Sequence, residues 1–82
     1  MTDYQAIDCR RHSELELHIM HKDQLILDWV DSEQQRHQTI AYATDIQSIK
    51  GDGEYLVIKD NNDYTSRIRL DRILSFKIDI NY

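Results

Sequence analysis

Residues 54–70 read EYLVIKDNNDYTSRIRL, and they contain two strand-like segments on either side of a polar turn. Glu54–Lys59 is short and rich in aromatic and β-branched residues, which is typical of a strand. Asp60–Asp63 contains only Asp and Asn, which tolerate the left-handed backbone of tight turns. Tyr64–Leu70 then alternates between apolar and polar side chains at its end, as a half-buried strand does. The stretch therefore predicts a β-hairpin.

Further strand-like segments lie on both sides of this hairpin. Ile73–Ile80 follows it and has an apolar residue at every second position from Leu74 onward. Gly51-Asp52-Gly53 precedes it and is the strongest turn signal in the chain. The earlier strand candidates are Gln24–Asp31, Gln38–Tyr42 and Ala43–Lys50. Five or more short strands, separated by turns at intervals of roughly ten residues, predict a mainly-β fold in the form of a small barrel or sandwich.

The segment before the first strand, residues 9–21, fits either a helix or a strand. Apolar and polar residues alternate from Leu15 to Ile19, which is a strand pattern. Ser13–Glu16 has the form S-x-x-E, which is a helix-capping sequence and leads into good helix formers. On a helix, Glu16 would interrupt one largely apolar face. The other members of that face would be Cys9, His12, Leu15, Ile19 and Met20.

Composition predicts one folded domain, residues 1–82, with 40% hydrophobic and 30% charged residues. The net charge is -5, and the acidic excess lies in residues 1–35, where eight acids accompany three bases. Such a region disfavours nucleic acid and suits either a solubilising surface or a basic partner. The start of the chain has no signal-peptide pattern, no apolar run could span a membrane, and Cys9 has no disulfide partner. We therefore expect a cytoplasmic protein without a membrane segment.

One cysteine and three histidines have the spacing C-x2-H-x5-H-x2-H, which raises the question of a metal site. A tetrahedral zinc site requires four converging ligands. On a helix, Cys9 and His12 lie on one face, and His18 and His21 lie on roughly the opposite face. Cys9 and His12 also lack an orienting third group or an oxyanion loop in the sequence. We therefore expect no metal, no cofactor and no catalytic site.

Several short motifs, taken in order from residue 4 to residue 76, resemble those of one protein family. The motifs are Tyr4-Gln5-x-Ile7-x-Cys9, Leu15-Glu16-Leu17, Leu25-x-Leu27, Ala43-x-Asp45-Ile46, Glu54-Tyr55-Leu56-Val57 and Arg69-Leu70-Asp71-x-Ile73-x-Ser75-Phe76. The chain resembles the Rof (YaeO) family of Rho-specific inhibitors of transcription termination, also called Rho-binding antiterminators. The opening and closing motifs are the most specific.

The resemblance implies an Sm-like fold, with an N-terminal helix at about residues 10–21 and a strongly bent small β-barrel or sandwich within residues 24–80. It implies a non-enzymatic protein that needs no cofactor. Family members bind the hexameric termination factor Rho at its N-terminal RNA-binding region and block RNA loading. We expect a free monomer, although Sm-like folds often pair edge strands to form rings. An alternative function is an Sm-like module that binds RNA itself, through Arg67, Arg69 and Arg72.

The resemblance also implies a set of Rho-binding residues. His12, Ser13 and Glu16 match the family's Rho-contacting helix, with acidic neighbours beside them, and a loop residue before the glycine turn matches a second contact. The full expected set is Asp8, His12, Ser13, Glu14, Glu16 and Lys50. Arg10 and Arg11 depart from the family pattern, because acids stand there in relatives, and His12 replaces an aromatic residue.

Overall fold

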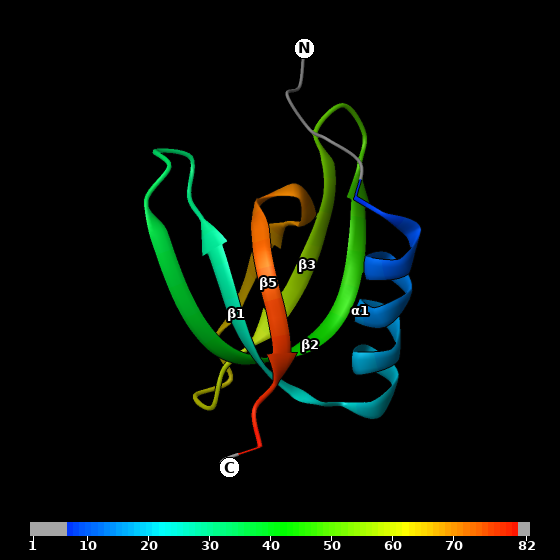
Figure 1. Cartoon of the computed structure of the whole chain (residues 1–82), viewed down its shortest axis with the longest axis vertical. Helices are drawn as coiled ribbons and strands as arrows, with labels where there is room; N and C mark the ends of the chain where they lie inside the picture. Colours follow the sequence, from blue (N-terminus) through cyan, green and yellow to red (C-terminus); the bar gives the residue numbers. More distant parts are fainter. Residues whose placement is uncertain (1–6, 81–82) are drawn as a thin grey trace.

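The computed structural model describes residues 7–80, in which one helix lies against a single antiparallel sheet (Figure 1). The helix α1 precedes all the strands, and a short 3-10 turn, η1, lies between the last two. The elements are α1 (Cys9–His21), β1 (Gln24–Val30), β2 (Arg36–Ile49), β3 (Gly53–Lys59), β4 (Thr65–Arg69), η1 (Leu70–Arg72) and β5 (Ile73–Ile78). This arrangement confirms the predicted mainly-β fold with an N-terminal helix, and it decides the ambiguous segment 9–21 in favour of a helix.

The sheet is bent, and its strand order is β4-β3-β2-β1-β5. Every paired neighbour is antiparallel. Within the described residues, β4 and β5 are the two edges, so the sheet curls toward a barrel without closing. The predicted hairpin at residues 54–70 is confirmed, since β3 pairs with β4 from Tyr55 opposite Arg69 to Lys59 opposite Thr65. Within residues 7–80, no helix is long and apolar enough to cross a bilayer.

The central strand β2 differs from the prediction, because Gln38–Tyr42 and Ala43–Lys50 are parts of one 14-residue strand. The first half of β2 pairs with β1 and the second half with β3. A β-bulge at Thr44 separates the two halves, and its hydroxyl donates a 3.2 Å hydrogen bond to the Val57 carbonyl. Bulges bend a strand and increase its twist. The bulge therefore lets one strand serve both sides of the curved sheet, as Figure 1 shows.

Helix α1 begins earlier than its capping sequence suggested. Asp8 is the N-cap, and its Oδ1 accepts a 2.7 Å hydrogen bond from the Arg10 amide. This bond satisfies one of the amides that a helix start leaves without a partner. The prediction that Ser13 begins a capping box was wrong, since Ser13 lies in the second turn. The helix ends at His21, and the C-cap Lys22 has a left-handed backbone with φ 55° and donates its amide to the His18 and Ile19 carbonyls.

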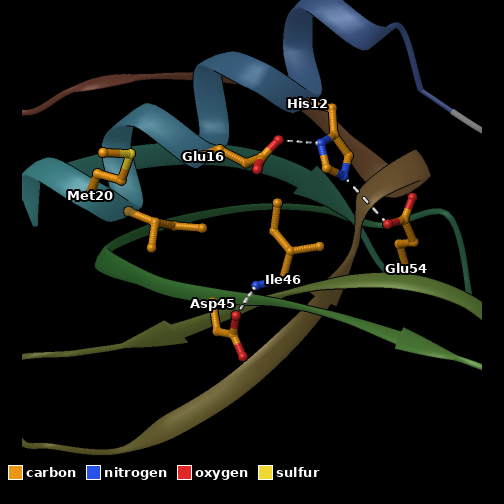
Figure 2. A pocket seen from close by; sticks show the side chains of 7 residues that line it. His12, Glu16, Met20, Asp45, Ile46 and Glu54 are labelled. Atoms are coloured by element: carbon orange, nitrogen blue, oxygen red, sulfur yellow. Dashed lines mark hydrogen bonds and ion pairs between the residues drawn. The ribbon is translucent and has the colours of Figure 1, made fainter.

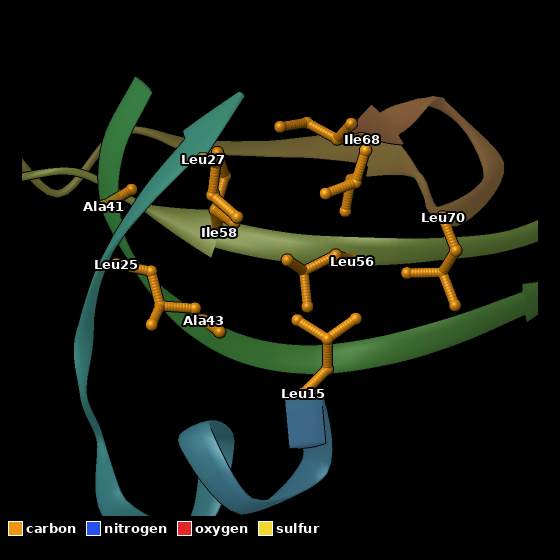
Figure 3. Packing of buried hydrophobic residues seen from close by; sticks show 10 residues of the cluster. Leu15, Leu25, Leu27, Ala41, Ala43, Leu56, Ile58, Ile68 and Leu70 are labelled. Atoms are coloured by element: carbon orange, nitrogen blue, oxygen red, sulfur yellow. The ribbon is translucent and has the colours of Figure 1, made fainter. Parts of the chain in front are cut away.

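The core lies between α1 and the inner face of the sheet (Figure 3). Leu15 is the one helix residue that is fully buried, at 1% exposure, and it packs over the sheet. The cluster consists of Leu15, Leu25, Leu27, Ala41, Ala43, Leu56, Ile58, Ile68, Leu70 and Ile73. Burial of a leucine of this kind is worth about 1.5–3 kcal/mol relative to exposure. The helix is thus fixed to the sheet by one central contact and by partly buried neighbours.

Strand β5 buries less of its apolar face than its alternation suggests. β5 ends at Ile78, two residues before the predicted end at Ile80. Ile73 is buried, whereas Leu74 and Ile78 are 48% and 42% exposed, and Ile80, beyond the strand, is 83% exposed. A shift in the β1–β5 register pairs Trp29 with Ile73 and Asp28 with Ser75, so Leu74 is an extra residue that faces solvent. As an edge strand, β5 also lacks a neighbour on one side.

Candidate functional site

A groove lies between α1 and the part of the curved sheet formed by β2 and β3, and we call it the acidic groove (Figure 2). Its volume is about 340 Å³. Its lining residues are His12, Glu16, Ile19 and Met20 from α1, Asp45 and Ile46 from β2, and Glu54 from β3. Three carboxylates and one imidazole therefore surround walls that are otherwise apolar.

His12 lies between two of these carboxylates. Its Nδ1 is 2.9 Å from Glu16 Oε1, and its Nε2 is 3.3 Å from Glu54 Oε2. The largest single influence on the pKa of His12 is its partial burial, which lowers it, but the hydrogen bonds and charges of Glu16 and Glu54 together outweigh burial. The net result is a pKa raised above 6.5. A protonated imidazole donates from both nitrogens, so this geometry suits the charged form.

The Thr44 bulge decides which side chains line the groove. Ala43 faces the core, and if residues 43–46 alternated strictly without a bulge, Asp45 would face inward as well. The bulge turns Ile46 toward the core margin instead, and Asp45 is exposed. Asp45 Oδ1 accepts a 2.8 Å hydrogen bond from the Ile46 amide. The acid and the apolar wall of the groove therefore depend on one backbone irregularity.

The structure brings only part of the predicted binding set together. His12 and Glu16 line the groove. Ser13 is exposed, and it neighbours Glu16 on the helix surface because the two are three residues apart. Glu14 lies apart from them, in a separate depression that is lined by Leu17, His18, His21, Asp23 and Ile78.

The two remaining predicted residues lie outside the groove lining. Asp8 is exposed and caps the helix. Lys50 is exposed in the turn between β2 and β3, and the next strand begins just beyond it with Gly53 and Glu54. Since Glu54 contacts His12, this turn lies beside the first turns of α1. Lys50 is therefore placed near one end of the groove.

Two carboxylates of the groove, Asp45 and Glu54, were not predicted as site residues. Both occur within motifs that carry the family resemblance, but nothing in their spacing indicates that they face α1. Their position requires the bulge in β2 and the register between β2 and β3, in which Ser48 lies opposite Glu54. The Ser48 hydroxyl also donates a 3.4 Å hydrogen bond to Glu54 Oε2.

The two arginines that depart from the family pattern have different environments. Arg11 donates from Nη2 to the Ile73 carbonyl at 3.1 Å, and its guanidinium carbon lies 5.4 Å from the centre of the Phe76 ring. Arg11 thus binds α1 to β5, on the side of the helix away from the groove. Arg10 is exposed. The positive charge of Arg11 is therefore directed away from the acidic groove.

The proposed basic RNA-binding face is not formed as the alternation suggested. Arg69 is only 7% exposed, and its guanidinium binds both carboxylate oxygens of Asp71 at 2.7 and 3.1 Å. Arg67 is exposed and lies 5.4 Å from the centre of the Tyr55 ring. The expectation that Arg67 and Arg69 share one exposed face was wrong, because the chain turns into η1 directly after β4.

The cysteine and the histidines have separate environments. Cys9 is exposed, and His12 lines the groove. His18 Nδ1 is 2.9 Å from Asp23 Oδ2, and His21 Nδ1 is 3.9 Å from the same oxygen. Throughout residues 7–80, no group of three or more His, Cys, Asp or Glu side chains has an arrangement that could hold a metal ion.

The fold and the groove define a small mainly-β domain, in which a helix and a curved sheet present a charged groove at the surface. A comparison with protein families identifies the particular family. The family described as modulator of Rho-dependent transcription termination (ROF) matches residues 6–81, and the chain belongs to it. The predicted membership is therefore confirmed, and the protein is a modulator of Rho-dependent termination. A comparison with curated proteins finds no significant match. The motif residues Tyr4 and Gln5 lie outside the described residues.

Proposed function

We propose that this protein is an antiterminator that binds Rho at its RNA-binding N-terminal region and blocks RNA loading. The acidic groove is the observation that carries the proposal, since it gathers three carboxylates at the surface of a member of this family. Action on Rho implies a cytoplasmic location, and this binding function requires neither catalysis nor a cofactor. The proposed centre of contact is His12, Ser13 and Glu16, with Asp8 and Lys50 at its margin.

The chemistry of the two surfaces supports this proposal. A protein surface that holds RNA must neutralise phosphates and is therefore basic. Glu16, Asp45 and Glu54 can form charge-assisted hydrogen bonds with its arginines and lysines. These acids come from a helix and two paired strands, so little further ordering is needed when the partner binds. Complementary charge also accelerates the encounter. Glu14 lies outside the groove, and we assign it a weaker role, as one of the negative charges around the groove that attract the basic partner.

A competition titration tests the proposal. Labelled C-rich RNA is bound to Rho, and wild-type protein, Glu16→Arg or Glu14→Arg is added. We expect wild type to displace the RNA and Glu16→Arg to require at least about tenfold more protein, because a reversed charge in a desolvated contact costs several kcal/mol. Glu14→Arg is the matched control, with the same charge change on the same helix outside the groove, and we expect a smaller effect.

Two outcomes would oppose the proposal. Failure of wild type to displace RNA at low salt would exclude competition at the RNA site. Equal weakening by the two variants would show that general charge, and not the groove, governs binding. The same titration without Rho measures direct RNA binding, for which the buried Arg69 leaves little basic surface on β4.

A further inference from the structure

We propose that the acidic groove accepts one arginine side chain of the basic partner, and that this arginine takes the place of the protonated His12 side chain between Glu16 and Glu54. The inference rests on the proposed function for the identity of the partner, and it adds the occupant of the groove and a proton-linked control of binding. It follows from the shape of the groove, the chemistry of its walls and the position of the imidazole within it.

The walls of the groove match a long side chain with an apolar stem and a charged end. Ile19 and Ile46 are partly buried against the core, and Met20 is 75% exposed beside them. Arginine buries its methylene stem along such surfaces and keeps its charged group near polar atoms. The carboxylates of Glu16 and Glu54 lie at the His12 end of the groove, as Figure 2 shows.

The His12 imidazole shows what kind of cation this end accepts. It is a flat group, and it meets one carboxylate at each ring nitrogen. A guanidinium is likewise planar, with donors spread around its edge, whereas the lysine ammonium is a compact point charge. Guanidinium is therefore the better replacement for an imidazolium that bridges Glu16 and Glu54.

Two acids contact His12, and they are Glu16 on α1 and Glu54 on β3. Asp45 on β2 also lines the groove, but its carboxylate points away from His12 and accepts from the Ile46 amide (Figure 2). While His12 is protonated, it neutralises part of this charge and occupies the hydrogen-bonding oxygens of two acids. An entering arginine must break those contacts and brings a second positive charge close to the ring. Binding should therefore release the His12 proton to solvent.

This linkage predicts that affinity rises with pH. Below the pKa of His12, each unit by which the pH is lowered should weaken binding by up to about tenfold, because one proton must be released when the arginine binds. Above that pKa the affinity should become constant. The chain has three other histidines, so the test must separate His12 from them.

The test uses an arginine hexapeptide and a lysine hexapeptide as probes, and NMR to follow the His12 ring across pH 5.5–8.5 in the folded protein. We expect the arginine peptide to lower the pKa of His12 and to bind more tightly than the lysine peptide. His12→Gln should bind the arginine peptide with the same affinity at pH 6 and pH 8. His21→Gln is the matched control, since His21 lies outside the groove, and it should retain the pH dependence of wild type.

Each contrary result has a defined meaning. Unchanged titration of His12 with saturating arginine peptide, or no binding of that peptide, would overturn the proposed exchange. Equal affinity for the two peptides would overturn the assignment to arginine. If RNA displacement from Rho persists in either case, the proposed function stands without this feature. If the peptide result holds and Rho is not bound, the groove is a site for arginine and the assignment to Rho fails.

Discussion

At the scale of single residues, His12 has a position that the sequence does not reveal. The sequence places it near Glu16, one helical turn away, and this neighbour could be anticipated. Glu54 is its second partner, and it lies 42 positions further along the chain. Only the packing of α1 against β2 and β3 brings the two together. Helical periodicity therefore predicts the contact of His12 with Glu16. The contact with Glu54 depends on how the sheet packs against the helix.

His12 should also link folding stability to pH. Its pKa in the folded protein is raised above 6.5, mainly because Glu16 and Glu54 together outweigh the effect of burial. The stability that His12 contributes is therefore fully present below about pH 6.5 and is lost as pH rises through the folded pKa. His12→Gln should reduce the free energy of unfolding more at pH 5.5 than at pH 8.5. Urea unfolding at both pH values measures this.

His21→Gln is the control for that experiment, because His21 is 65% exposed and lies outside the groove. An equal loss of stability for His12→Gln at both pH values would mean that His12 acts by packing alone. A larger loss at pH 8.5 would contradict the proposed ion pairs.

At the scale of elements, α1 depends on very few contacts with the sheet. Leu15 is its only fully buried residue, although the predicted apolar face also contained Ile19 and Met20. The helical pattern predicted the face that contains Leu15 and Ile19, but it could not predict that Met20 stays exposed. That difference arises because the curved sheet leaves a groove beside the last turns of the helix.

Removal of the Leu15 side chain should therefore detach or destabilise α1. Leu15→Ala should lower the free energy of unfolding by about 2–5 kcal/mol, the range found for buried leucines that leave a cavity. Leu17→Ala is the control on the same helix, since Leu17 is 50% exposed, and it should cost less than about 1 kcal/mol. Thermal and urea unfolding measure both. Equal effects of the two substitutions would contradict the observed orientation of α1.

Strand β2 makes a second prediction at this scale. Deletion of Thr44 places Asp45 directly after Ala43, so alternation still directs Asp45 outward and Ile46 inward, but β2 loses the bend that the bulge provides. A straighter β2 pairs less well with both β1 and β3 in the curved sheet, so we expect the deletion variant to unfold cooperatively but at a lower temperature than wild type. Thr44→Val keeps the extra residue and removes only the hydroxyl bond to Val57, so it should cost about 1 kcal/mol. Circular dichroism during heating distinguishes the two variants, and a deletion variant that melts at or above the temperature of Thr44→Val would contradict the proposed role of the bulge.

At the scale of the whole molecule, patterning predicted the antiparallel strands and their turns more fully than it predicted the site. Alternation identified the hairpin at residues 54–70, because local turn chemistry and local pairing agree there. It divided β2 into two segments, because a bulge changes the alternation without any glycine or proline to mark it. It also overestimated the buried face of β5, since burial depends on neighbours that an edge strand lacks.

The two open sheet edges predict the state of the free protein. β4 and β5 are short, with five and six residues, and they carry the exposed bases Arg67 and Lys77. Pairing of β4 from one copy with β5 of another would bring like charges together, and charged edge strands resist such pairing. We expect a monomer at all concentrations up to about the millimolar range, as measured by sedimentation. If wild type formed rings or dimers and Arg67→Thr did not, this explanation would be contradicted, because the charge of Arg67 would then promote association.

The shared strand β2 also has a consequence for how the chain acquires its structure. Most strand pairings join strands that are adjacent along the chain. The two hairpins at the centre of the sheet, β1–β2 and β2–β3, both use β2. Neither can be completed while β2 is unformed, so the two sides of the sheet should appear in one kinetic step. Among the strand pairings, that of β1 with β5 closes the longest loop, and its entropy cost should set the barrier. Refolding should thus follow a single exponential, and a fragment that ends before β5 should remain unfolded.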